Sequence, residues 1–161
     1  MAKFSLEKNH SRINELRQEA ESKKEMTEKL ETAKEELVTA RSEIEGSEVS
    51  EETKEAFVQS LELRREEISE QAQEVGDEIG NDLSELEEIM QEVQSVEESN
   101  EAQQKSIENR MAILEKLGMG GMLENSLDIL QNESGQIEEL KNAIIEARKI
   151  AEDVARTAGS I

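Results

Sequence analysis

The sequence contains no cysteine, proline, tryptophan or tyrosine, and only one histidine and two phenylalanines. The lack of cysteine excludes disulfide bonds, thiolate metal ligands and thiol nucleophiles. The lack of tryptophan and tyrosine removes the aromatic side chains on which nucleic-acid bases usually stack. Because proline is the strongest helix breaker, its absence from all 161 residues leaves long helices uninterrupted. The composition therefore favours an all-helical protein.

The charge of the chain is strongly one-sided. There are 40 Asp and Glu residues against 19 Lys and Arg, for a net charge of −21 at pH 7. A surface of this sign repels phosphate groups, which disfavours nucleic acid and anionic membranes as partners. No segment approaches the roughly 20 apolar residues that span a bilayer, and the first residues lack the apolar core of a signal peptide. We therefore expect no membrane insertion, and a protein that is cytoplasmic or exported without a cleavable signal peptide.

In the first part of the chain, apolar residues recur at alternating steps of three and four, which is the spacing of a heptad seam. This pattern predicts a helix over residues 11–45. Its seam positions are Ile13, Leu16, Ala20, Met26, Leu30, Ala33, Leu37, Ala40 and Ile44. The step from Ala20 to Met26 predicts a stammer, which overwinds a helix locally. Gly46 then predicts a left-handed C-cap, and Ser50 predicts the N-cap of the next helix.

A second and longer seam follows over residues 50–117. Ten of its twelve positions between residues 58 and 96 are apolar, and only Arg65 and Asp82 interrupt it. The residues expected to form its core are Ile68, Val75, Ile79, Leu86 and Ile89. The pattern leaves open whether this segment is one helix or bends near residue 80 or 99.

Three glycines, Gly118, Gly120 and Gly121, lie within four residues. Glycine lowers helix propensity and permits positive φ, so these residues predict a turn. After the turn, a last helix is expected to pack back along the first two, with Ile129, Ile145 and Ile150 widening its apolar face. The expected fold is all-α, with a long antiparallel helical hairpin over residues 1–117. Residues 118–161 extend it to a three- to four-helix bundle with coiled-coil packing.

The residues that metal binding or catalysis needs are scarce. A di-iron bundle requires Glu-x-x-His pairs on facing helices, but the single histidine is His10, which has no glutamate three residues before it. One histidine cannot activate a dispersed set of serines. We therefore expect no catalytic residue, no cofactor and no metal site. A metal-dependent helical-bundle enzyme is the remote alternative.

Negative charge is concentrated in the middle of the chain. Between Glu66 and Gln104 there are 14 acidic residues and no Lys or Arg. A long surface of one sign attracts and steers a partner of the opposite charge. The expected partner is therefore another protein with a basic or amphipathic helical surface. The expected contact residues are Glu85, Glu88 and Glu92 in the acidic stretch, and Ile144 and Ile150 on the last helix.

The corner Ile44-Glu45-Gly46, between two long helices, is similar to the apolar-x-Gly corner of the WXG100-type and LXG-type helical hairpins of bacterial type VII secretion. The likeness covers about residues 10–97. Ile44 occupies the position of the family's tryptophan, and the chain has no tyrosine for the family's Y-x-x-x-D/E export motif. The resemblance implies a small targeting module or chaperone-like partner of a secreted toxin. From the residues themselves we expect a non-enzymatic protein-binding module, with a self-assembling coiled-coil scaffold that forms homo-oligomers as the alternative.

Overall fold

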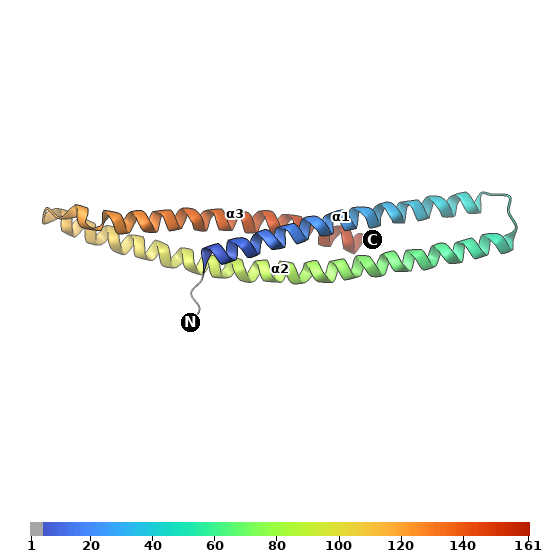
Figure 1. The fold of residues 1–161 in the computed structure, drawn as a ribbon, viewed down its shortest axis with the longest axis horizontal. Coiled ribbons are helices and arrows are strands. Elements are labelled where there is room, and N and C mark those ends of the chain that lie inside the picture. The colour runs from blue at the N-terminus through green and yellow to red at the C-terminus, as the bar shows by residue number, and fades with distance from the viewer. Residues whose placement is uncertain (1–4) are drawn as a thin grey trace. The chain divides into compact units, whose positions relative to one another are not determined.

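The computed structural model describes residues 5–161, and every regular element in this part of the chain is helical (Figure 1). Helix α1 spans Leu6–Glu45, α2 spans Glu51–Lys116 and α3 spans Glu124–Ser160. A short 3-10 helix, η1, spans Gly120–Leu123. The fold is therefore all-α. Residues 1–4, which belong to the segment expected to lack a signal peptide, lie outside the described residues.

Serine side chains begin both of the first two helices. The Oγ of Ser5 accepts a hydrogen bond from the backbone N–H of Lys8 at 3.3 Å, so α1 begins before the predicted residue 11. The Oγ of Ser50 accepts one from the N–H of Thr53, also at 3.3 Å, which confirms the predicted N-cap of α2. Each bond satisfies a backbone donor that the first turn of a helix leaves unpaired.

The end of α1 differs from the prediction. Gly46 does not have positive φ, so the expected left-handed cap is wrong. Its N–H still donates to the carbonyl of Ser42 at 3.0 Å, as in a continuing helix. The hydroxyl of Ser47 donates to the carbonyl of Ile44 at 2.7 Å. The backbone N–H of Ser47 donates to the same carbonyl at 3.2 Å, so Ser47 satisfies one of the carbonyls that the last turn of the helix leaves unpaired.

The turn after α2 is a Schellman motif around Gly118. The N–H of Met119 donates to the carbonyl of Leu114 at 2.8 Å, and the N–H of Gly118 donates to that of Glu115 at 3.0 Å. Gly118 has φ of +74°, the conformation that this motif requires. Gly120 and Gly121 do not have positive φ and instead belong to η1.

We expect Gly118→Ala to lower the free energy of unfolding by about 1 kcal/mol, because a Cβ strains the left-handed conformation. Gly121→Ala is the matched control, since Gly121 has no positive φ and a Cβ there would meet no atom within 4 Å. Urea denaturation of both variants measures the difference. Equal stability of the two variants would contradict the assigned role of Gly118.

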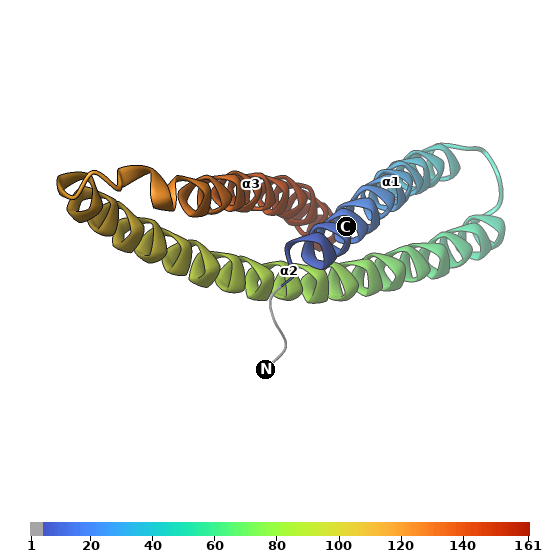
Figure 2. The same ribbon diagram turned by 60° about the vertical axis from the view of Figure 1, so that its left-hand side comes forward.

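Residues 16–84 and 148–161 pack as one compact unit, called unit 2 here. Its core cluster takes residues from all three helices, namely Ala20, Val75, Ile79, Ala151 and Val154. Gly76 of α2 faces α3, since a Cβ on it would lie 3.7 Å from the Cβ of Ala158. In both views the C-terminal end of α3 lies against α1 (Figures 1 and 2), where Lys34 Nζ donates to the main-chain oxygen of Ile161 at 3.1 Å. Small residues thus allow close packing of three helices.

The predicted stammer in α1 is wrong. Thr27 is 1% exposed, whereas Met26 is 48% exposed. The inward-facing residues of α1 that follow Ala20 are therefore Lys23 and Thr27. The steps from Ala20 to Lys23 and from Lys23 to Thr27 are three and four, which keeps the heptad intact. Burial of the Thr27 hydroxyl is possible because it donates to the carbonyl of Lys24 at 2.8 Å. Two polar residues therefore occupy seam positions.

A charged pair crosses the seam of unit 2. Lys23 Nζ of α1 lies 3.5 Å from Asp82 Oδ2 of α2 and 3.3 Å from Glu78 Oε2. The side chains of Lys23 and Asp82 are only 14% and 12% exposed. Lys23, a polar residue in the seam of α1, therefore pairs with Asp82, a polar residue in the seam of α2.

Residues 1–15 and 85–147, described from residue 5, form the second compact unit, called unit 1 here. Asn100 occupies a buried seam position, where its Nδ2 donates to the carbonyl of Leu130 at 3.0 Å. Its Oδ1 accepts a hydrogen bond from Gln104 Nε2 at 2.6 Å. Both the nitrogen and the oxygen of this buried amide are thus hydrogen-bonded, and the amide links α2 to α3.

The predicted core of the second helix is buried throughout. Ile68, Val75 and Ile79 in unit 2 and Leu86 and Ile89 in unit 1 have exposed fractions of 0–6%. No break interrupts the segment near residue 80 or 99, because α2 is one helix from Glu51 to Lys116. The phase of the seam is kept through residues 80 and 99, and this continuity favours an unbroken helix.

Candidate protein-binding surfaces

The three glutamates predicted to bind a partner have different environments in unit 1. Glu85 forms a bidentate ion pair with Arg12 of α1, with both N–O distances 2.6 Å. The hydrogen bonds from Arg12 lower the pKa of Glu85. Glu88 and Glu92 are exposed, and no ion pair involves them within residues 5–161. Glu85 therefore joins α1 to α2, whereas Glu88 and Glu92 are the accessible members of the set.

A second ion pair joins α2 to α3 in unit 1. Lys141 Nζ lies 2.9 and 3.2 Å from the two carboxylate oxygens of Glu97. The hydrogen bond to Glu97 raises the pKa of Lys141. Both side chains are about 30% exposed, so this carboxylate also serves packing within the unit.

Unit 2 carries an acidic stripe that counting acids alone did not reveal. Glu66, Glu70, Glu74 and Glu78 follow one another at steps of four along α2, and all are exposed. Residues four apart lie on the same face of a helix, so their charges repel one another. Glu78 is partly compensated by Lys23, whereas Glu70 and Glu74 make no ion pair among the described residues. The step of four in the sequence was the signal that could have identified this stripe.

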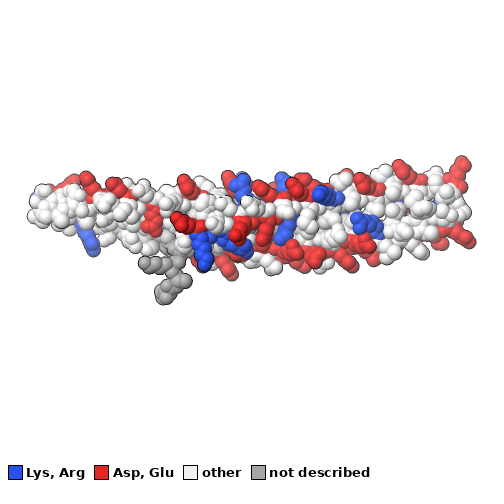
Figure 3. Space-filling view, viewed as in Figure 1, with Lys and Arg blue, Asp and Glu red and all other residues white. Residues whose placement is uncertain are grey.

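The surface view shows where charged side chains gather on one face (Figure 3). Acidic side chains are far more abundant than basic ones, and the basic ones mostly lie beside acids. The end of unit 1 that carries the α2–α3 connection is largely uncharged in this view. Its exposed large apolar residues are Ile113, Leu117, Met119 and Met122.

The apolar contact residues expected on the last helix require correction. Ile144 is 1% exposed and belongs to the core of unit 1, so it is not accessible to a partner in this structure. Ile150 is half-buried and packs against the core cluster of unit 2. Ile129 and Ile145 instead face outward, at 59% and 48% exposed. The width of the apolar stripe in the sequence does not show which of its residues face the core and which face outward.

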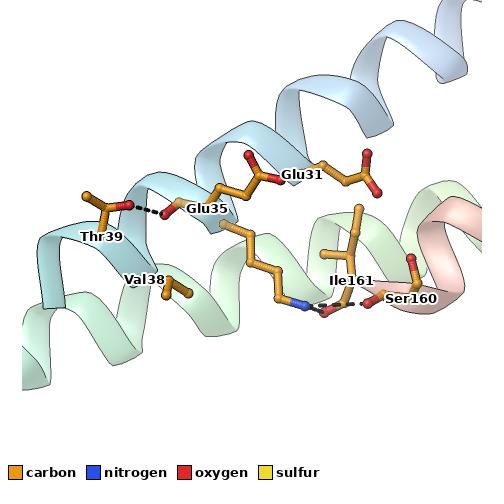
Figure 4. Close-up of a pocket in the computed structure, with 7 residues that line it drawn as sticks. Glu31, Glu35, Val38, Thr39, Ser160 and Ile161 are labelled. Carbon is orange, nitrogen blue, oxygen red and sulfur yellow. Dashed lines mark hydrogen bonds between the residues drawn. The ribbon is translucent and has the colours of Figure 1, made fainter. Parts of the chain in front are cut away.

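The end of α3 borders a cavity of about 410 Å³ against α1 in unit 2 (Figure 4). Lys34 Nζ donates to the main-chain oxygens of Ser160 and Ile161. The hydroxyl of Thr39 donates to the backbone carbonyl of Glu35. Both donors are thus used within the chain, and the arrangement contains no nucleophile with a neighbouring base. This site fixes the end of α3 on α1.

Comparison with known protein families, curated proteins and solved structures finds no match to this chain. Within residues 5–161, no helix combines the length and the apolar character that crossing a membrane requires. The same residues contain no group of three or more His, Cys, Asp or Glu placed to hold a metal ion.

Proposed function

We propose that this chain is a non-enzymatic protein-binding module that docks a basic or amphipathic helix of another protein on the acidic surface of α2. The acidic stripe of unit 2 carries the proposal. Each like-charge pair at a step of four costs a helix about 0.2–0.5 kcal/mol. A sequence selected for solubility alone could avoid this cost by mixing charges of both signs. Retention of the stripe is explained if a cationic partner neutralises it.

The architecture proposed with this function is a long antiparallel helical hairpin of α1 and α2, extended by α3 into a bundle. Three ion pairs support it. Arg12 pairs with Glu85, Lys23 pairs with Asp82, and Glu97 pairs with Lys141. Within unit 2, Lys23 of α1 pairs with Asp82 of α2, whereas Leu37 and Val38 of α1 line a groove with Val58 and Leu61 of α2. Residue numbers therefore rise along α1 as they fall along α2, as antiparallel helices require.

The biological setting that we propose follows from the Ile44-Glu45-Gly46 corner. This corner lies where α1 ends and the connection to α2 begins. Its likeness to type VII secretion hairpins suggests a targeting or chaperone-like partner of a toxin or other effector. A self-assembling scaffold is the alternative, and sedimentation velocity of the purified chain separates the two.

The test uses the double variant Glu70→Lys/Glu74→Lys and, as probe, a synthetic amphipathic helix with lysine on its polar face. We expect association with the native chain to slow as salt is raised, because ions screen exposed charges over about 8 Å at physiological ionic strength. The variant should associate roughly tenfold more slowly at low salt. Stopped-flow fluorescence measures both rates. The double variant Glu88→Lys/Glu92→Lys applies the same test to the acidic surface of unit 1.

The matched control is Glu28→Lys/Glu36→Lys, which makes the same change in net charge on exposed positions of α1. The stripe variant should be at least as stable as the native chain, since the pairs at positions 66/70 and 74/78 become attractive and only the pair at 70/74 stays repulsive. Slower association therefore cannot be attributed to misfolding. If the control slows association as much as the stripe variant does, total charge alone governs binding and the proposed surface is wrong.

A further inference from the structure

A second surface of unit 2 has the opposite character from the acidic stripe. Between α1 and α2 lies a groove of about 240 Å³ with an apolar floor. Leu37 and Val38 of α1 and Val58 and Leu61 of α2 form this floor. The groove adjoins the cavity at the end of α3, because both are lined by Lys34 and Val38.

Helix α3 covers the α1–α2 seam only as far as Lys34. Where α3 is present, Ala20, Val75 and Ile79 are at most 4% exposed. In the groove, Val38 is 61% exposed and the other floor residues are half-buried. No helix of the described residues covers this part of the seam. Two helices alone leave an apolar surface that a third helix would bury.

The charged residues that line the groove indicate the sign of the charge that its occupant carries. Three cations, Lys34, Arg41 and Arg65, line it against Glu45 and Glu62, although the whole chain has a net charge of −21. Arg41 already pairs with Glu45 at 3.2 Å, and Lys34 bonds the end of α3. Arg65 occupies a seam position, is exposed, and makes no ion pair within residues 5–161. An unpaired guanidinium beside an apolar floor suits a carboxylate carried on an apolar stripe.

We propose that this groove binds one amphipathic α-helix of another protein, with apolar residues on the floor and one carboxylate paired with Arg65. The helix is close to neutral overall, since a strongly acidic one would be repelled by the chain. A second copy of this chain is a poorer occupant, because it adds a further net charge of −21. The groove is separate from the acidic stripe, so this proposal holds even if the stripe binds nothing.

The probes are two synthetic amphipathic helices built from leucine, alanine and glutamine, identical except for one glutamate or one glutamine within the leucine stripe. Neither contains a cation, so neither reports on the acidic stripe. Fluorescence anisotropy should show roughly fivefold tighter binding of the glutamate peptide to the native chain, as expected for a partly exposed ion pair. Arg65→Glu should reverse this preference.

Arg64→Glu is the matched control, because it makes the same charge change at the neighbouring position, which pairs with Glu67 and does not line the groove. This variant should keep the preference for the glutamate peptide. The chain has no cysteine, so Val58→Cys in the groove and exposed Ser60→Cys outside it give single disulfide sites for a cysteine-bearing peptide. Only the first should cross-link.

Equal binding of both peptides by the native chain and Arg65→Glu, or no binding at all, would overturn the proposal. So would cross-linking at both cysteines. A native dimer in sedimentation velocity that Arg65→Glu dissociates would make a second copy the occupant instead, and would also overturn it.

Discussion

Ile79→Ala is expected to lower the free energy of unfolding by about 2–5 kcal/mol, the range for truncating a fully buried aliphatic side chain. Ile79 is 0% exposed and belongs to the core cluster of unit 2. Two of its cluster neighbours, Ala20 and Ala151, are too short to fill the space that the truncation leaves. We therefore expect a value in the upper part of the range, measured by urea denaturation followed by circular dichroism.

Leu63→Ala on the same helix is the control, because Leu63 is 63% exposed. Its effect should stay within about 0.5 kcal/mol. Leu86→Ala applies the same test to unit 1, where Leu86 is 1% exposed. A loss of only a few tenths of a kcal/mol at Ile79 would show that the packing of α2 described above is wrong.

Apolar spacing was sufficient to place the seam of α2. Its buried residues recur in one phase from Ile68 to Val93, and a step of three and four has only one helical interpretation. Local signals also sufficed at Ser50, because an N-cap needs only a short polar side chain and the first turn of its own helix. Both features depend on residues that are close in the sequence.

Polar seam residues could not be predicted in the same way. Thr27 is buried through a bond to its own helix, and a pattern that counts only apolar residues selects Met26 instead. Lys23 becomes a seam residue only because Asp82, distant in the sequence, lies opposite it. The burial of such residues depends on partners that spacing along one helix does not identify.

The sequence predicted the charge of the candidate surfaces, but not which of their residues are accessible. The acidic excess of α2 is visible in the sequence, but the ion pair that occupies Glu85 depends on Arg12 of another helix. Ile144 and Ile145 are adjacent and chemically identical, yet one is buried and the other exposed. Their difference is set by which side of α3 meets its neighbours, and this is a property of the packed unit.

Removing one member of the Lys23–Asp82 pair should have an effect as large as a core truncation. Lys23→Ala leaves the Asp82 carboxylate 12% exposed without the cation 3.5 Å away. Breaking a buried pair in this way costs about 3–5 kcal/mol, because the remaining charge has lost its partner and stays out of water. We expect a loss of about 3 kcal/mol in urea denaturation, since Lys23 also contacts the exposed Glu78 and the site is not fully dry. Arg64→Ala, which breaks an exposed ion pair of α2, should cost no more than about 0.5 kcal/mol.

The double variant Lys23→Leu/Asp82→Leu separates stability from specificity. Replacing a whole buried pair with apolar residues is often neutral or stabilising, so we expect it to recover most of the loss seen in Lys23→Ala. A polar pair in a seam also opposes alternative registers, in which each charge would face an apolar residue. The double variant should therefore be stable but sample more than one register of α1 on α2, visible as extra amide peaks in NMR spectra. If Lys23→Ala alone is as stable as the native chain, the pair contributes nothing to packing, and the register of α1 on α2 is set by the apolar seam residues.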